Sequence, residues 1–251
     1  MSSSASSSSH EVIKDLLKSC TAVCFDVDST VQLDESIDIL ADFAGKGPEV
    51  SALTKSAMSG AMKFEDTLKA RLDLIKPSRK MVQDCLKTHP IRFSPLLPEF
   101  VNLLTKKLGK KVFLVSGGFT DMIFPVADAL DLPRSHVFAN VLFFDDETEH
   151  GDYKGFDPTA FTARSGGKSR AVSHIIENIL MLKKTKKEND NNNKKSEDVT
   201  AIMIGDGATD LEAKPPASAV IGYGGVVVRE KVKAGADLFV MSFRELIEML
   251  E

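Results

Sequence analysis

The sequence has little of what marks a secreted, membrane-bound or nucleic-acid-binding protein. Its 251 residues include only three cysteines, without metal-ligand spacing, and one of them, Cys24, lies in an apolar run. Free thiols in a reducing compartment are therefore favoured over disulfides, and we expect a cytoplasmic protein. A net charge of −4 gives no electrostatic reason for binding nucleic acid, and no apolar run reaches the length of a membrane span.

Two segments are polar and of low complexity. Residues 1–10 are mostly serine with no hydrophobic segment behind them, which excludes a secretory signal and predicts a disordered tail. Residues 183–198 are rich in lysine and asparagine, and they predict a solvated loop. Acidic residues dilute the lysines of this loop, so solvation is favoured over polyanion binding.

Apolar runs that fit buried strands alternate with amphipathic helical segments along most of the chain. The run at 22–25 is unbroken, and those within 111–115 and 200–204 are similar, which is typical of strands buried on both faces of a parallel sheet. We therefore predict an α/β fold with a doubly wound, Rossmann-like parallel-sheet core, formed by residues 11–31 and 96–251. Helical patterns within 32–95 predict a small inserted helical bundle. Other expected elements are a helix at 11–19, a helix at 120–130, a hairpin of 137–144 with 153–156, and a helix at 168–183.

Polar residues follow three of the predicted strands where each strand ends. Asp26 and Asp28 follow the first strand, a Ser-Gly-Gly segment begins at Ser116 after the second, and Asp206 and Asp210 follow the third. Because the carboxyl ends of parallel strands form the ligand site of such folds, we expect these residues to meet. An isolated Asp-x-Asp is more often the start of a turn, and the two other clusters favour a site here.

Several carboxylates brought together repel one another, and a divalent cation with oxygen ligands offsets that repulsion. Mg2+ is the usual cation where a substrate phosphate supplies a further ligand. The Ser116 hydroxyl and the N–H groups of Gly117 and Gly118 offer donors to a phosphoryl oxygen. Lys168, at the start of a predicted helix, adds a cation beside a helix N-terminus. These features together predict chemistry on a phosphorylated small molecule.

The motifs DVDST, SGG, a lone lysine and GDGATD resemble those of the haloacid dehalogenase superfamily. From residue 21 to residue 250 the likeness extends to its phosphoserine phosphatase family, through SAMSGAMKFEDTLKARL, VFLVSGGF, VFAN, SGGK and IMIGDGATDLEA. The resemblance implies Mg2+-dependent hydrolysis of O-phosphoserine through an aspartyl phosphate, the last step of serine biosynthesis. It also implies that the bundle within 32–95 is a cap domain that closes over the site.

The resemblance assigns the chemical steps to two carboxylates. Asp26 would attack the phosphoryl group, and Asp28 would protonate the serine oxygen and then activate the hydrolytic water. Mg2+ would be held by the Asp26 side chain, the Asp28 backbone carbonyl and Asp206. Lys168 would hold phosphoryl oxygens and offset the carboxylates, with Asp210 orienting it.

The resemblance also implies a set of substrate contacts. Glu35 matches a residue that meets the substrate amino group, and Arg71 matches one that meets its carboxylate. At Ser59 the family often has glycine, so a positive φ there would be less comfortable in this chain. The implied contacts are Glu35, Met58, Ser59, Phe64, Arg71, Ser116, Gly117, Gly118, Lys168 and Thr209.

Arg71 is informative without any family, because it lies within the apolar stripe of the predicted helix 64–75. An arginine there either extends its head to water or pairs with an anion, and the residues alone leave both options open.

Other enzyme classes fit the sequence less well. The GGKS at 166–169 suggests a P-loop kinase, but Thr162 stands where the first glycine of that motif is required. Asp28 argues against a dehalogenase, because a halide needs no proton donor. The alternative that remains is a phosphotransferase of the same superfamily that passes the phosphoryl group to another small alcohol. The sequence leaves the oligomeric state open, with a homodimer as one option.

Overall fold

The structure is a computed structural model that describes residues 3–58, 63–181 and 199–251. The predicted solvated loop at 183–198 and the predicted substrate contact Ser59 lie outside the described residues. In the part of the chain that is described, no helix is both long and apolar enough to span a membrane. The three cysteines are free, as expected from the sequence, and all three are buried.

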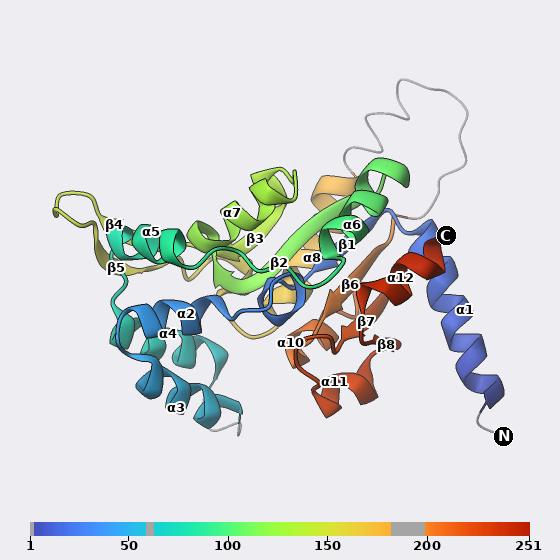
Figure 1. The fold of residues 1–251 in the computed structure, drawn as a ribbon, viewed down its shortest axis with the longest axis horizontal. Coiled ribbons are helices and arrows are strands. Elements are labelled where there is room, and N and C mark those ends of the chain that lie inside the picture. Colours follow the sequence, from blue (N-terminus) through green and yellow to red (C-terminus); the bar gives the residue numbers. More distant parts are fainter. Residues whose placement is uncertain (1–2, 59–62, 182–198) are drawn as a thin grey trace.

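A six-stranded parallel sheet lies at the centre of the molecule, in the order β3-β2-β1-β6-β7-β8 (Figure 1). Its strands are β1 (Ala22–Phe25), β2 (Lys111–Phe119), β3 (Val137–Asn140), β6 (Ala201–Gly205), β7 (Ala219–Tyr223) and β8 (Leu238–Val240). All four residues of β1 are fully buried, which is why this strand reads as an unbroken apolar run. The predicted α/β fold with a doubly wound parallel sheet is confirmed.

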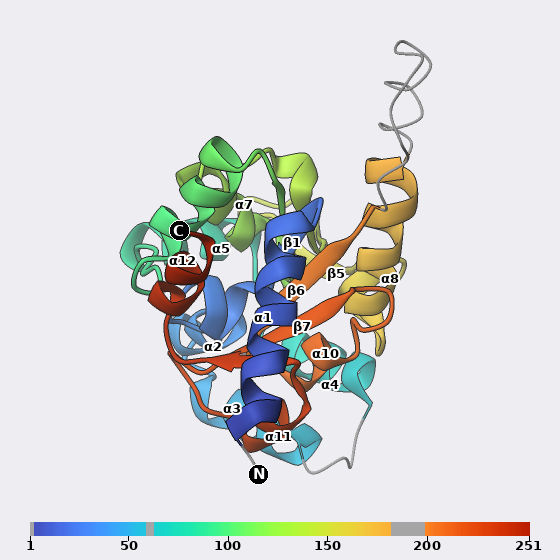
Figure 2. The ribbon, with the colours of Figure 1, turned by 90° about the vertical axis from the view of Figure 1, so that its right-hand side faces the viewer.

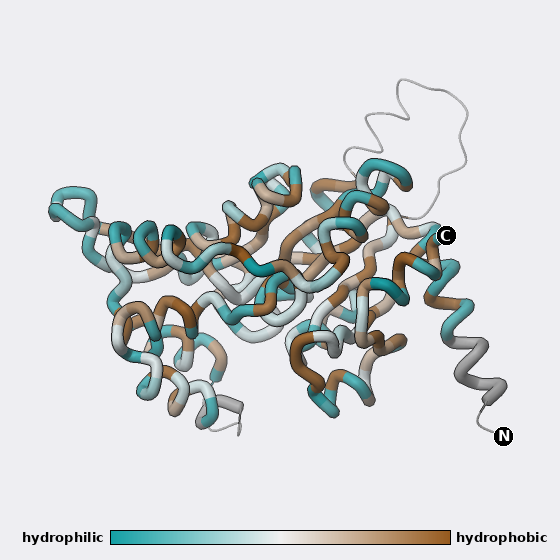
Figure 3. The backbone as a smooth tube through the Cα atoms, viewed as in Figure 1, coloured by the Kyte–Doolittle hydropathy of each residue, from teal (hydrophilic) through white to brown (hydrophobic). Residues whose placement is uncertain are grey.

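Helices cover both faces of this sheet (Figure 2). Val23 and Phe25 of β1 face one layer, while Ala22 and Cys24 face the other, as the two-residue period of a strand requires. The first layer consists of α1 (Ser3–Ser19), α6 (Leu97–Asn102), η2 (Leu103–Lys107), α7 (Thr120–Ala129) and α12 (Phe243–Leu250). The second contains α8 (Gly167–His174) and its continuation η5 (Ile175–Met181). Hydrophobic residues accordingly gather along the central strands in Figure 3.

In the described part of the chain, four α-helices lie between β1 and α6, and we call them the inserted helices. They are α2 (Ser36–Phe43), α3 (Gly47–Met58), α4 (Phe64–Ile75) and α5 (Arg79–Thr88). Leu40, Leu68 and Leu72 belong to their own hydrophobic cluster, separate from the two clusters of the sheet. The hairpin of β4 (Leu142–Asp145) and β5 (Asp152–Phe156) packs against the same cluster and lies beside α5 in Figure 1.

The chain leaves the sheet for the inserted helices and returns along two segments that pair with each other. Gln32 forms an antiparallel bridge with Phe93. The Leu33 N–H donates to the Arg92 carbonyl at 2.9 Å, and the Ser94 N–H donates to the Val31 carbonyl at 3.0 Å. This pairing therefore holds the first residues of the insertion in place immediately after the end of β1.

Shorter helical elements complete the fold. They are η1 (Val27–Val31), η3 (Arg134–His136), η4 (Phe161–Ala163), α10 (Ala208–Leu211) and α11 (Glu230–Gly235). The elements η1, η4 and α10 lie at the carboxyl ends of strands or next to them, and they carry residues of the site described below.

The prediction of a disordered serine tail is wrong from Ser3 onward, because α1 begins at Ser3 rather than at residue 11. Ile13 and Leu17 anchor the second half of this helix in the core. The serine tract contains neither proline nor glycine, so nothing in its sequence stops the helix from continuing toward the N-terminus.

Two strand boundaries also differ from the prediction. β2 does not stop at Val115 but runs through Ser-Gly-Gly to Phe119, which pairs with Asn140 across an irregularity in the register. The same pairing divides the expected first arm of the hairpin, because residues 137–140 join the main sheet as β3 and only the segment from Leu142 pairs with β5.

Candidate active site

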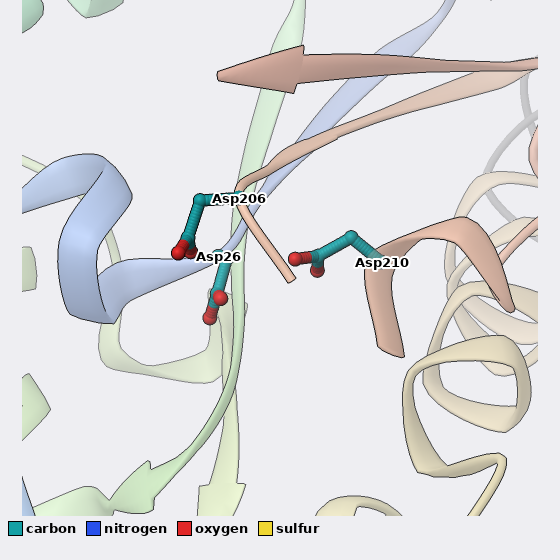
Figure 4. A group of neighbouring side chains, drawn as sticks. All are labelled: Asp26, Asp206 and Asp210. Carbon is teal, nitrogen blue, oxygen red and sulfur yellow. The ribbon is translucent and has the colours of Figure 1, made fainter. Parts of the chain in front are cut away.

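The register of the sheet brings the three predicted clusters together. Phe25 at the end of β1 lies between Leu114 of β2 and Ile204 of β6. The Asp26 N–H donates to the Ile204 carbonyl at 2.8 Å, so Asp26 and Asp206 leave the sheet side by side. In Figure 4 the carboxylates of Asp26, Asp206 and Asp210 point toward the same space.

A cavity of about 210 Å³ opens at this edge of the sheet. Its wall includes Thr162 and Ser165 from the segment before α8, and Ile37 from the inserted helices. Of the predicted site residues, the wall includes Asp26, Asp28, Glu35, Phe64, Arg71, Gly117, Gly118, Lys168, Asp206 and Thr209. The sequence therefore identified most of the residues that the fold brings together here.

The remaining predicted residues have other positions. Ser116 lies behind the wall with 1% of its surface exposed, and its hydroxyl oxygen accepts a hydrogen bond from the Gly118 N–H at 2.9 Å. Asp210 is fully buried behind Lys168. Met58 is the last residue of α3, and its side chain is not described.

Lys168 bridges two carboxylates beneath the cavity. Its Nζ lies 2.8 Å from Oδ2 of Asp26 and 2.7 Å from Oδ1 of Asp210. Burial lowers the pKa of Lys168, but Asp210 and Asp26 more than offset that effect, so the net shift is upward and the ammonium group stays charged. The other oxygen of Asp210 accepts from the Gly207 N–H at 2.9 Å.

Two glycines make room for this bridge. A Cβ atom on Gly205 would lie 2.2 Å from the carboxylate of Asp210, so only glycine allows the carboxylate to approach the strand. A Cβ atom on Gly167 would lie 2.5 Å from the Phe161 carbonyl oxygen, so glycine is also required where α8 begins next to η4. The GDG and SGGK motifs thus have a local steric basis.

The acidic cluster has the donor set of a hard cation site. One carboxylate oxygen from each of Asp26, Asp206 and Asp210 lies within 4.8 Å of the others. Asp26 and Asp206 line the cavity, whereas Asp210 is fully buried behind Lys168, so Asp26 and Asp206 are the side chains suited to ligation. Burial, followed by repulsion from the Asp26 carboxylate, raises the pKa of Asp206. A divalent cation bound between the two carboxylates would relieve that repulsion.

Asp28 carries two functionally different oxygens. Oδ1 accepts from the Gln32 amide at 2.9 Å, from the Ser36 hydroxyl at 2.6 Å and from the Ser36 N–H at 3.2 Å. Oδ2 faces Gly118, where a Cβ atom would lie 3.4 Å away from it. Burial, with added repulsion from Glu35 and Asp26, raises the pKa of Asp28 to about 7. This carboxyl group can therefore give up and take back a proton near neutral pH.

Glu35 and Arg71 place opposite charges on the wall of the cavity. Oε1 of Glu35 accepts from the Ser29 hydroxyl at 2.8 Å, and burial is the main cause that raises the Glu35 pKa. Nε of Arg71 is buried and has no hydrogen-bond partner among the described residues. An arginine with an unpaired buried donor, next to a cavity, is suited to an anionic ligand.

Arg229 is a site residue that the sequence reasoning missed. Its Nε donates to Oδ2 of Asp206 at 2.8 Å, and its guanidinium lies 3.7 Å from Oε1 of Glu35. It follows β7, so the rule that identified the residues after β1, β2 and β6 could also have found it. Arg164, which also lines the cavity, was missed as well, although it precedes the recognised SGGK motif by one residue.

Comparison with known proteins places this site in a family. The family model described as haloacid dehalogenase-like hydrolase matches residues 20–213. The chain belongs to this family. A phosphoserine phosphatase of Rattus norvegicus is 44% identical to it, over 97% of this chain and 99% of the relative. The relative named "Phosphoserine phosphatase, chloroplastic" from Arabidopsis thaliana is 45% identical, over 95% and 75%.

Solved structures agree with the fold. The structure titled "Phospho-Aspartyl Intermediate Analogue of Phosphoserine phosphatase" superposes with a TM-score of 0.68 at 27% identity, over 92% of this chain and 99% of that chain.

The raised pKa of Asp28 predicts how stability depends on pH. Because the folded protein binds this proton more tightly than the unfolded chain, the parent protein loses stability as the pH rises from about 4 through about 7. In the metal-free protein, Asp28→Asn avoids this loss. We expect the unfolding free energy of the variant, measured relative to that of the parent, to rise by about 1–3 kcal/mol between pH 5 and pH 8.

Urea denaturation in chelator at both pH values measures this difference. Asp15→Asn, at an exposed position of α1, is the control and should show no such growth. If the difference in unfolding free energy between Asp28→Asn and the parent is the same at both pH values, the pKa of Asp28 is not raised in the folded protein.

Proposed function

We propose that this protein hydrolyses O-phosphoserine to serine and inorganic phosphate, with Mg2+, through an aspartyl phosphate on Asp26. The observation that carries the proposal is a single cavity that joins Asp26 and Lys168 to Glu35 and Arg71. Phosphoserine has one ammonium and one carboxylate group beside its phosphate, and Glu35 and Arg71 are the complementary pair. The similarity to curated phosphoserine phosphatases supports the same substrate.

In the first step, a carboxylate oxygen of Asp26 attacks phosphorus as the bond from phosphorus to the serine oxygen breaks. Lys168 binds a phosphoryl oxygen and offsets the charge of the nucleophile, from which it lies 2.8 Å away. Asp28 gives its proton to the departing serine oxygen, which is a poor leaving group as an alkoxide. The Ser116 hydroxyl oxygen accepts from the Gly118 N–H and so holds in place the Gly117–Gly118 segment, which lines the cavity beside the phosphoryl group.

In the second step, water attacks the phosphoaspartate and Asp28 accepts its proton. The bond between phosphorus and Asp26 breaks, so inorganic phosphate forms and both carboxyl groups return to their starting states. Asp26, Asp206 and the Asp28 carbonyl would hold Mg2+, which when bound neutralises charge on the phosphoryl group. Asp210 acts behind the site, where it keeps Lys168 charged and aimed at Asp26.

The inserted helices serve as the cap domain, formed by residues 32–95, over a catalytic core of residues 11–31 and 96–251. Phe64 of α4 reaches across to Gly117, since a Cβ atom there would lie 3.4 Å from its ring. Oε2 of Glu65 accepts from the Ser165 N–H at 3.3 Å and from its hydroxyl at 3.2 Å. These contacts join the inserted helices to the loop before Lys168 and would exclude water during phosphoryl transfer.

We further propose that the protein works in the cytoplasm. Three buried free thiols favour a reducing compartment. One similar protein is named chloroplastic, so fractionation of cells that express the full chain should compare those two compartments.

Release of inorganic phosphate from O-phosphoserine tests the proposed activity. We expect turnover with Mg2+, loss of turnover in excess chelator, and recovery when Mg2+ is restored, because the carboxylates otherwise repel the phosphate. A repeat with radiolabelled serine measures exchange into phosphoserine, and one with glycerol as acceptor detects transfer. Full activity in chelator would contradict the metal site, and phosphoryl transfer to glycerol in place of phosphate release would indicate a phosphotransferase.

Substrate choice tests the role of Arg71. We expect Arg71→Ala to lower kcat/KM for phosphoserine by about two to four orders of magnitude, if the lost contact contributes roughly 3–5 kcal/mol. Arg71→Lys keeps the charge and should lose less. Phosphoethanolamine has no carboxylate, so it should be a poor substrate that is almost indifferent to either change. An equal loss with both substrates would show that Arg71 is structural.

A further inference from the structure

We propose that Gln32 and Ser36 are positioning residues that hold Oδ1 of Asp28 so that Oδ2 is the atom that carries the catalytic proton. The inference rests on the proposed function, because it assigns an atom to the proton transfers of that mechanism. Neither Gln32 nor Ser36 belongs to the motifs that identified the site from the sequence.

The hydrogen bonds around Oδ1 have only one consistent set of directions. The Gln32 Nε2 group is a donor only, and it lies 2.9 Å from Oδ1 of Asp28 and 3.1 Å from the Ser36 hydroxyl. The Ser36 hydroxyl therefore accepts from Gln32 and directs its own hydrogen to Oδ1, at 2.6 Å. The Ser36 N–H gives Oδ1 a third donor at 3.2 Å.

This arrangement determines where a proton can sit on Asp28. A proton on Oδ1 would point toward these donors and would cost at least one of the hydrogen bonds. Oδ2 accepts no hydrogen bond from the residues that the structure describes, and it lies at Gly118, on the wall of the cavity. The proton therefore belongs on Oδ2, which faces the place of phosphoryl transfer.

The two holding residues are themselves well fixed. Only 8% of Gln32 and 1% of Ser36 is exposed. Gln32 is bridged to Phe93 where the two connecting segments pair, and Ser36 is the first residue of α2. The start of the inserted helices thus clamps the carboxyl group and prevents its rotation about the bond to Cβ.

The consequence for the reaction is a single proton path. As the bond from phosphorus to serine breaks, the Oδ2–H bond of Asp28 breaks and the proton moves to the serine oxygen. In the second step, Oδ2 takes a proton from water as the water oxygen bonds to phosphorus and Asp26 leaves. Loss of the clamp would allow rotation and reduce the fraction of time in which Oδ2 is aligned for either transfer.

The test uses substrates that differ in their need for a proton. The leaving group of p-nitrophenyl phosphate departs without protonation, whereas serine requires it. For Gln32→Met, Ser36→Ala and the double variant, we expect kcat with phosphoserine to fall about 5- to 50-fold, with KM within about twofold, as part of the contribution of acid–base catalysis is lost. Release of p-nitrophenol in a single turnover with excess enzyme should stay within about twofold of the parent.

Two further variants make the readout specific. Ser36→Thr keeps the hydroxyl group and should restore most of the rate that Ser36→Ala loses. Gln83→Met, a matched change at an exposed position of α5, should behave as the parent. Thermal unfolding confirms that each variant is folded before its rates are compared.

Three results would overturn the proposal. They are kcat values with phosphoserine that stay at the parent level, losses of the same size in the single turnover of p-nitrophenyl phosphate, and a failure of Ser36→Thr to recover activity. If the parent hydrolyses p-nitrophenyl phosphate but not phosphoserine, the proposed substrate fails instead. The inference is then tested with p-nitrophenyl phosphate alone, because hydrolysis of the phosphoaspartate still needs Oδ2 of Asp28. In the variants, steady-state turnover of this substrate should fall, while release of p-nitrophenol in a single turnover should not.

Discussion

The rest of the site depends on one buried ammonium group between two carboxylates. Lys168 and Asp210 are almost completely removed from water, and neither could stay charged there alone. Removing one partner of such a pair typically costs about 3–5 kcal/mol, because the other charge is left buried and unpaired. The bridge to Asp26 extends this pairing to the cavity, so the same ammonium group also holds Asp26, the proposed nucleophile, at the end of β1.

That interaction explains why the surrounding backbone has its particular form. Gly205 lets the Asp210 carboxylate lie against the end of β6, and Gly167 lets α8 start close to η4, which brings Lys168 to the sheet. On the opposite side of the cavity, Asp28 is held by Gln32 and Ser36, where the inserted helices begin. The two carboxylates proposed to be catalytic thus have different supports. The sheet and its second layer hold Asp26, and the insertion holds Asp28.

Much of this arrangement could be predicted from the sequence, because parallel strands place their carboxyl ends at one edge. Asp26, Ser116 and Asp206 could be assigned to that edge without coordinates. The side-chain partners of Asp28 could not, because they depend on how the insertion folds back. Ser36 is the clearest case. A serine before an apolar helical segment usually caps the helix, but in the structure Glu35 is the N-cap residue of α2 and the Ser36 hydroxyl donates to Asp28. Helix propagation into the serine tract likewise depended on the anchoring of α1 in the core.

The proposed mechanism depends on covalent phosphorylation of Asp26, which can be observed by trapping the phosphoaspartate. The protein is mixed with phosphoserine labelled in its phosphoryl group, quenched in acid within the first turnover, and the labelled peptide is sequenced by mass spectrometry. We expect label on the peptide that contains Asp26. We expect none in the Asp26→Asn variant, which keeps Lys168 and Asp210 as in the parent. Label on a different residue, or phosphoserine hydrolysis that persists in Asp26→Asn, would contradict this mechanism.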